Sequence, residues 1–406
     1  MDSLITAAAR ALAAGDPLGA LKLVALRDDA PALALRGIAI AQLGDFTRAK
    51  ALLRKAGRGF SPREAVARAR CVIAEAEIAL VSRDLNFPAK TLDAARATLE
   101  ARGDRLNAAH ARHLEVRRLV LIGRLDEAER VLARLDPAPF PPASRAAYEL
   151  VVAGIAMRRV RAKTARTALA RAVDAARQAG IPALITEIES ARRALDTPAA
   201  RLIARGSKRS LLLDDVEEIL SSKALVVDAC RHIVRVQQAV AALATRPVLF
   251  ALVRALAEAW PGDVPRSTLL ARAFRAKFTD ESHRARLRVE IGRLRKKLGA
   301  LADVNATEHG FALVPHRARE VVVLARPVEE EHADVLAFLI DGESWSSSAL
   351  ALALGESQRS VQRALDSLAA AGRVQSLGHA RARRWMAPPL PGFTTTLLLP
   401  GPLPSG

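Results

Sequence analysis

The chain has 406 residues, half of them apolar, so it can bury the cores of about two to four domains. Its formal net charge of +19 favours polyanions, of which nucleic acid is the usual intracellular example. No run of eighteen apolar residues is present to span a bilayer, and Met1 is not followed by the basic segment of a signal peptide. We therefore expect a cytoplasmic protein with no membrane partner.

Residues 1–200 have an almost wholly helical pattern, with apolar residues at three- and four-residue steps and many alanines. Helix breaks recur through this segment, at Gly15, Gly44, Asp84, Gly123 and Arg159. Each break precedes a second helix, such as Asp126–Asp136. A single helical pair cannot bury its own apolar face, so stacked neighbours must supply the core.

These recurring hairpins resemble the tetratricopeptide repeat, which has a small residue at the turn and alanine at the close helix crossing. The spacing here departs from the family's period, and the family's Trp and Tyr positions are unfilled. The resemblance implies an α-solenoid over residues 1–200 whose groove binds a protein or peptide partner. The alternative is a spacer or a dimerisation scaffold. A dimerisation scaffold would make the chain a homo-oligomer.

Residues 201–224 are expected to be a connector between this array and the C-terminal half of the chain. The connector holds a run of four acids, namely Asp214, Asp215, Glu217 and Glu218. Acids at a helix start suit the positive end of the helix dipole, so we interpret the run as a solvated face. A metal site is the less favoured alternative, because no histidine or further acid is spaced to complete a ligand shell.

From residue 225 the pattern changes to short strands, in the segments 225–228, 230–236 and 239–243. Three helices are predicted next, over 247–259, 266–276 and about 282–298. A hairpin is predicted over Asn305–Val314, which contains the segment GFAL. A small sheet therefore precedes three helices and a hairpin.

The third of these helices carries the most specific motif of the chain. Its segment Leu287–Leu298, LRVEIGRLRKKL, matches the pattern VDVHISRLRKKL of OmpR/PhoB-type DNA-binding domains at eight of twelve positions. The hairpin resembles the family's wing, although it is one residue shorter and lacks the usual arginine. The resemblance implies a winged-helix domain over residues 225–316 whose third helix enters the DNA major groove. The helical array stands where response regulators have a receiver, so control by aspartyl phosphate is not predicted.

At 100° per residue, Leu287, Ile291, Leu294 and Leu298 share one side of this helix. The candidate DNA-binding residues are its cations, Arg284, Arg286, Arg288, Arg293, Arg295, Lys296 and Lys297. Arg286 and Arg293 are the candidates for contacts with guanine. Ala285 stands where the family has an arginine, so no base preference is implied. The alternative is a basic, solvated helix with no nucleic-acid partner.

Residues 317–327 are expected to be a linker or a strand, and residues 328–387 resemble generic winged-helix transcription factors. Helices are predicted over Glu329–Ile340, Ser346–Leu354 and Ser357–Ala371, and a hairpin over Arg373–Met386. The candidate DNA-binding cations are Arg359, Arg363, Arg381, Arg383 and Arg384. Docking to a protein is the alternative role of this domain. Residues 388–406 form a Pro-rich tail.

The sequence lacks the GxxxxGK[ST], GxGxxG, HExxH and GxSxG patterns, and Cys71 and Cys230 are far apart. We therefore predict no enzyme, no cofactor and no metal. The predicted fold class is mainly α: an α-solenoid followed by two α+β winged-helix domains. The predicted function is a nucleoid-associated transcriptional regulator that binds double-stranded DNA. The alternative is a non-enzymatic scaffold or adaptor subunit that tethers a partner complex to nucleic acid without strong sequence specificity.

Overall fold

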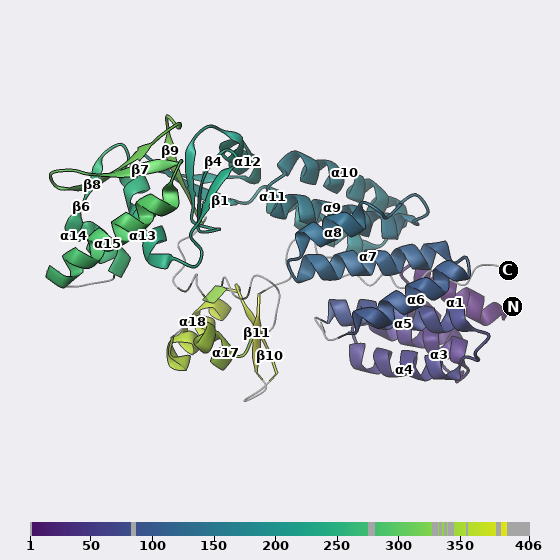
Figure 1. Cartoon of the computed structure of the whole chain (residues 1–406). Coiled ribbons are helices and arrows are strands. Elements are labelled where there is room, and N and C mark those ends of the chain that lie inside the picture. The colour runs from purple at the N-terminus through teal and green to yellow at the C-terminus, as the bar shows by residue number, and fades with distance from the viewer. Residues whose placement is uncertain are drawn as a thin grey trace. The chain divides into compact units, whose positions relative to one another are not determined.

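The chain is mainly helical and carries a small mixed sheet (Figure 1). The computed structural model describes residues 2–82, 87–274, 281–326, 345–354, 356–378 and 383–387, with residues 332, 335, 336 and 339. Two compact units are present, and residues Leu195–Glu330 make up nearly all of the second. Within the described ranges, no helix is long and apolar enough to cross a membrane.

The first 195 residues form an array of consecutive helices, with no strand in their described part (Figure 1). The helices are α1 (Ser3–Ala13), α2 (Pro17–Val24), α3 (Ala30–Gln42), α4 (Phe46–Gly59), α5 (Ala65–Val81), α6 (Ala89–Ala101), α7 (Arg105–Leu121), α8 (Leu125–Leu132), α9 (Pro142–Arg158), α10 (Ala162–Ala179) and α11 (Pro182–Leu195). One apolar cluster joins α1 to α3, and others join α3 to α5, α5 to α7 and α7 to α9. Each helix therefore depends on its neighbours for burial.

The predicted helix breaks at Gly15, Gly44, Gly123 and Arg159 all lie between helices, and Asp84 falls outside the described residues. The three glycines have φ between 76° and 92°, which L side chains rarely adopt. Two further turns were not predicted, at Gly103 and Gly180. The predicted helix Asp126–Asp136 is too long, because α8 ends at Leu132, shortly before Pro137 disfavours a helical backbone.

A charged cluster is buried between α5 and α7. The fully buried carboxylate of Glu77 accepts a hydrogen bond from Arg117 Nη1 at 3.0 Å and lies 2.9 Å from Nε2 of His110. The ring of His113 stacks 6.4 Å from that of His110, and neither nitrogen of His113 has a hydrogen-bond partner among the described residues. Burial, with Arg117 nearby, holds the pKa of His113 well below its ordinary value of 6.5.

We expect the array to lose stability as the pH falls below 6.5 because of His113. The unfolded chain binds a proton there that the buried imidazole excludes, so the free energy of unfolding should fall by up to about 1.4 kcal/mol per pH unit. Above pH 6.5 this contribution is constant. Urea denaturation of the wild type and of His113→Leu across this range measures the effect. The variant should show a shallower decline, whereas the exposed His309→Gln should follow the wild type; equal slopes for all three would contradict the expectation.

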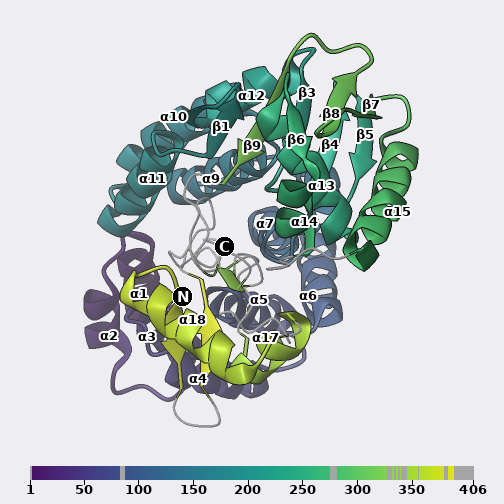
Figure 2. The ribbon, with the colours of Figure 1, turned by 90° about the vertical axis from the view of Figure 1, so that its left-hand side faces the viewer.

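Residues Leu195–Glu330 of the second unit are called the central unit below. The central unit contains a six-stranded sheet in the order β2-β1-β9-β3-β4-β5 (Figure 2). The three strands predicted after residue 225 are confirmed as β3 (Leu225–Asp228), β4 (Ile233–Val236) and β5 (Ala239–Ala242). The segment 317–327, predicted as a linker or a strand, contains β9 (Val321–Ala325). This strand runs antiparallel to β1 and parallel to β3, so it lies inside the sheet and all five of its residues are buried.

The prediction that residues 201–224 are a connector is wrong. They form most of β1 (Ala200–Ala204), all of β2 (Ser207–Leu211) and α12 (Leu213–Ser221), and these elements belong to the central unit. The first four residues of β2 are polar and exposed, which hid the strand pattern in the sequence. Of the four acids, Asp215 accepts a hydrogen bond from the Leu212 amide at the start of α12, in agreement with the helix-start interpretation.

The three predicted helices of the central unit are confirmed as α13 (Pro247–Ala259), α14 (Arg266–Phe274) and α15 (Glu281–Leu298). A second, three-stranded sheet has the order β6-β8-β7, with β6 (Asp263–Pro265), β7 (Ala302–Ala306) and β8 (Gly310–Pro315). The predicted hairpin is therefore β7 and β8. A single apolar core joins the helices, this sheet and one face of the larger sheet.

The turn of the β7–β8 hairpin is closed by side chains from β6 and α14. Arg266 donates Nη1 to the carbonyl of Glu308 and Nη2 to that of Thr307, at 3.0 and 3.1 Å. The Thr307 hydroxyl donates to Asp263 at 2.5 Å and accepts from the Gly310 amide at 2.9 Å. A Cβ atom added to Gly310 would collide with the backbone of β6, so this position requires glycine.

Replacing this glycine tests the close approach of β6 and β8. Gly310→Ala should lower the free energy of unfolding of the central unit by about 1–3 kcal/mol or more, because backbone has to move. Gly292→Ala is the matched control, since that helical position has open space around its Cβ and alanine should stabilise it by about 0.5–1 kcal/mol. Thermal denaturation of both variants checks the pair. Equal melting temperatures would refute the predicted contact.

The described part of the C-terminal segment contains α17 (Ser347–Leu354), α18 (Gln358–Ala370), β10 (Gln375–Leu377) and β11 (Arg384–Met386). Strands β10 and β11 pair antiparallel, which confirms the predicted hairpin. Ser357 caps α18 as predicted, its hydroxyl accepting from the Ser360 amide at 3.1 Å. The predicted helix Glu329–Ile340 and the tail 388–406 lie mostly or wholly outside the described residues.

Candidate nucleic-acid interface

Helix α15 separates an apolar face from a cationic one. Leu287, Ile291, Leu294 and Leu298 are between 0 and 2% exposed and pack into the core of the central unit, as their spacing predicted. Four residues on the other side of the helix are all exposed, namely Arg286, Val289, Arg293 and Lys296. In Figure 2 this helix lies at the outer edge of the unit, beside α13 and α14. Its outer face is therefore open to a partner.

Three of the predicted DNA-binding cations of α15 are already engaged within the central unit. Arg293 forms an ion pair with Glu290 at 2.7 Å, and the guanidinium of Arg286 lies 4.6 Å from the centre of the Phe274 ring. Arg295 Nε donates to the carbonyl of Val304 at 2.6 Å, which ties the end of α15 to β7. Arg286 and Arg293 would have to exchange these contacts for contacts with bases.

The cations that remain available on α15 are Arg288, Lys296 and Lys297. They are exposed and have no ion pair or hydrogen bond from their side chains among the described residues. Lys296 lies in the centre of the outer face, while Arg288 and Lys297 lie on its two flanks. Arg284 is exposed near the helix start. Arg288 and Lys297 thus place available positive charge on both sides of the outermost line of residues of the helix.

The outermost line of α15 is built from small side chains. At 100° per residue, Ala285, Val289 and Gly292 point away from the buried leucines, together with Lys296. Val289 is 53% exposed and a Cβ at Gly292 would meet nothing within 4 Å. This line allows another surface to approach the helix backbone closely, between the two flanks of cations.

The β7–β8 turn adds no cation to this surface. Its exposed tip residues are Glu308 and His309, and Arg266 is used to hold the turn. The hairpin therefore differs from the basic wing that the family resemblance implies, as the sequence already indicated. Any contact that this tip makes with phosphates would have to come from backbone amides or from the imidazole of His309.

The second predicted cation set lies on α18 and on the β10–β11 hairpin. Arg359 and Arg363 are exposed on the side of α18 opposite the buried Val361, Leu365 and Leu368. Arg383 lies 4.2 Å from the centre of the Trp385 ring, and Arg384 is exposed at the start of β11. Arg381 lies outside the described residues. The surface is cationic. Arg383 lies directly before β11 and Arg384 is the first residue of that strand, which has three residues.

Other kinds of site find little support in the described part of the chain. No group of three or more His, Cys, Asp or Glu residues there could hold a metal ion. Burial raises the pKa of the Cys71 thiol to about 12, so this thiol is protonated at neutral pH and is a poor nucleophile. The cationic helices are therefore the candidate nucleic-acid interface.

Comparison with known proteins returns no match for this chain: no family model fits it, and neither a curated protein nor a solved structure is significantly similar. The functional proposal below therefore rests on the geometry and charge of the residues described above.

Arg295 and Lys296 provide a test of which cations are structural. Arg295→Ala removes the hydrogen bond between α15 and β7 and should lower the free energy of unfolding by about 1–2 kcal/mol. Lys296→Ala removes the same charge from the neighbouring position and should change stability by about 0.5 kcal/mol or less. Thermal denaturation of the two variants distinguishes them. If both are equally stable, Arg295 belongs with the available cations instead.

Proposed function

We propose that this chain is a DNA-binding transcriptional regulator in which α13–β8 and the C-terminal segment are two winged-helix domains. Helix α15 carries the proposal, because its apolar side is fully buried and its outer side is cationic. The order helix, strand, two helices, hairpin, with β6 paired to β8, is also that of a winged-helix domain. The part before α13 contributes the sheet that precedes the three helices in the OmpR-like family.

Duplex DNA suits the outer face of α15 in shape and in charge. An α-helix fits into the major groove, which is about 12 Å wide, and the small residues along its outermost line permit a close approach. Arg288, Lys296 and Lys297 can neutralise phosphates without breaking any contact in the protein, and counterion release then favours binding. Val289 is placed to contact a thymine methyl group, and Arg286 or Arg293 to reach guanine.

The remaining parts of the chain receive roles that follow from the same proposal. Arg359 and Arg363 on α18 and the cations of the adjoining hairpin give a second contact with the duplex. The helical array is then an α-solenoid that senses or recruits a protein or peptide, or that joins two copies of the chain. A protein of this kind acts on the nucleoid in the cytoplasm and needs no catalytic step.

A non-enzymatic scaffold or adaptor subunit is the second candidate, and one observation favours it. Both arginines proposed to read bases are already held, Arg293 by Glu290 and Arg286 by Phe274, and the hairpin tip carries Glu308. Free lysines without free base-reading arginines would tether a partner complex to nucleic acid with little sequence preference.

Removing the available cations should weaken DNA binding in a salt-dependent manner. For the triple variant Arg288→Ala, Lys296→Ala, Lys297→Ala, the slope of log K against log salt should fall by about 0.9 for each phosphate that the helix no longer neutralises. A control variant with Lys22, Lys55 and Lys90 of the array changed to alanine has the same net charge. Fluorescence anisotropy with a random duplex measures both. If the two variants bind equally, α15 is not the DNA-binding helix.

The two candidate functions differ in their expected specificity for DNA sequence. A regulator should prefer its own operator over random duplex by about a thousandfold or more, whereas a tether should show steep salt dependence with little preference. Selection of binding sites from a random duplex library, repeated with Arg293→Ala, provides the measurement. An unenriched library would favour the tether, and enrichment that disappears in the variant would favour the regulator.

A further inference from the structure

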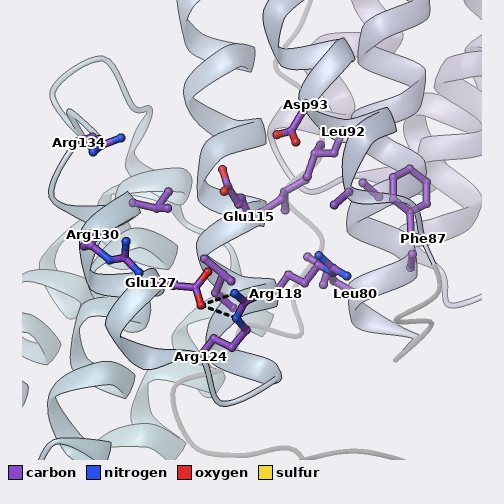
Figure 3. A pocket seen from close by; sticks show the side chains of 16 residues that line it. Leu80, Phe87, Leu92, Asp93, Glu115, Arg118, Arg124, Glu127, Arg130 and Arg134 are labelled. Carbon is purple, nitrogen blue, oxygen red and sulfur yellow. Dashed lines mark hydrogen bonds and ion pairs between the residues drawn. The ribbon is translucent and has the colours of Figure 1, made fainter.

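The helical array contains a cavity that none of the roles above explains. It has a volume of about 300 Å³ and lies between α5, α6, α7 and α8 (Figure 3). Apolar side chains make up much of its wall, namely Leu80, Phe87, Leu92, Leu119 and Val131. The volume is at the small end of the range for ligand pockets in proteins, and it suits one small molecule rather than a folded segment.

Two charged groups of α7 line this cavity without a hydrogen bond or ion pair from their side chains to any described residue. Arg118 is partly buried, and its Nε is inaccessible to solvent and has no hydrogen-bond acceptor among the described residues. Glu115 lies one turn earlier and forms no ion pair within the described part of the chain. Burial raises the pKa of Glu115, as does the neighbouring carboxylate of Asp93, while the charges of Arg96, Arg112 and Arg118 act in the opposite direction. Figure 3 places Glu115 and Asp93 close together in this wall.

Of the other charges around the cavity, Asp93, Arg124 and Glu127 have a partner of opposite charge, whereas Arg130 and Arg134 have none among the described residues. Glu127 pairs with Arg124, and Asp93 lies 3.8 Å from Arg96 on the same helix. Arg130 donates its Nε to the backbone carbonyl of Asp126. An unpaired donor and an unpaired carboxyl group in a partly apolar wall both carry a desolvation penalty. A ligand with one acceptor and one cationic donor would remove both penalties together.

The spacing of Glu115 and Arg118 narrows the class of ligand. Residues three apart on a helix have Cβ atoms about 5–6 Å apart, so a single molecule must present its two opposite charges close together. An α-amino acid carries its ammonium and its carboxylate on one carbon. A plain organic anion would leave Glu115 unpaired beside Asp93, and a plain amine would leave the guanidinium group of Arg118 without an acceptor among the described residues.

We propose that the cavity binds a free α-amino acid with a large apolar side chain. Its carboxylate accepts a hydrogen bond from Arg118, its ammonium donates to Glu115, and its side chain packs on Leu80, Phe87 and Leu92. This site gives the array a small-molecule ligand in addition to the protein or peptide partner proposed above, and it does not depend on DNA binding.

Isothermal titration of the full chain with L-phenylalanine tests the proposal. The matched probes are 3-phenylpropionate, which lacks the ammonium, 2-phenylethylamine, which lacks the carboxylate, and L-alanine, which lacks the apolar group. L-Phenylalanine should bind at least about tenfold more tightly than any of them, equivalent to about 1.4 kcal/mol. Equal affinity for L-phenylalanine and 3-phenylpropionate, or no binding of L-phenylalanine up to about 10 mM, would overturn the proposal.

Variants assign the two charged contacts. Arg118→Gln should weaken L-phenylalanine binding by about tenfold, and Glu115→Gln should abolish the preference for L-phenylalanine over 3-phenylpropionate. The exposed array positions Arg102→Gln and Glu189→Gln serve as charge-matched controls and should bind as the wild type does. Ala89→Leu narrows the cavity from its exposed rim without altering charge, and it should also weaken binding. If the controls lose as much affinity as the pocket variants, the ligand binds elsewhere.

The outcome is separable from the proposed DNA function. The α15 triple variant should lose DNA affinity and still bind L-phenylalanine, whereas Arg118→Gln should retain the DNA affinity of the unliganded wild type. Failure of the ligand arm with intact DNA binding overturns only the amino-acid site, and the reverse result overturns only the role of α15.

Discussion

The architecture of the central unit depends on the burial of β9. All five residues of this strand are apolar and buried, and it lies between β1 and β3 in the six-stranded sheet. Because β9 follows the hairpin in sequence, the chain completes the sheet only after it has passed through three helices and the β7–β8 hairpin. Strands from the beginning and from the end of the central unit therefore cover the same apolar core, which lies between the sheet and the helices. The buried apolar residues of α15 pack in that core. The cationic side of that helix faces outward as a consequence.

The charge on α15 divides into structural and available parts once these contacts are known. Arg295 holds the helix to β7, Arg293 pairs with Glu290, and Arg286 rests on Phe274. Arg288, Lys296 and Lys297 are left to attract a polyanion. The available cations of such a helix can bind phosphates without breaking contacts inside the protein. Base contacts by Arg286 and Arg293 require these arginines to leave Phe274 and Glu290, respectively. Affinity and specificity therefore depend on different residues of the same helix.

In the helical array, each helix is instead buried by its neighbours in the chain. That arrangement places polar residues in the interior between α5 and α7, where Glu77 is paired with Arg117 and His113 is left without a partner among the described residues. It also leaves a cavity among four consecutive helices, in which the side chains of Glu115 and Arg118 form no hydrogen bond or ion pair with described residues. Both features concern α7, so protonation and ligand binding would act on the same part of the array.

The local sequence pattern was sufficient to predict many of the helices and turns of this protein. Helix α13 has the predicted bounds, α15 begins one residue from the predicted start, and the Ser357 cap and four helix breaks lie where residue type placed them, because periodicity and turn chemistry are properties of neighbouring residues. Tertiary structure decided the rest. The β1–β2 hairpin was missed because the first four residues of β2 are polar and exposed, and because β9, the strand that pairs with β1, comes far later in the chain. The pairing of the α15 arginines and the cavity between α5 and α8 arise from contacts between elements, and no local pattern carries that information.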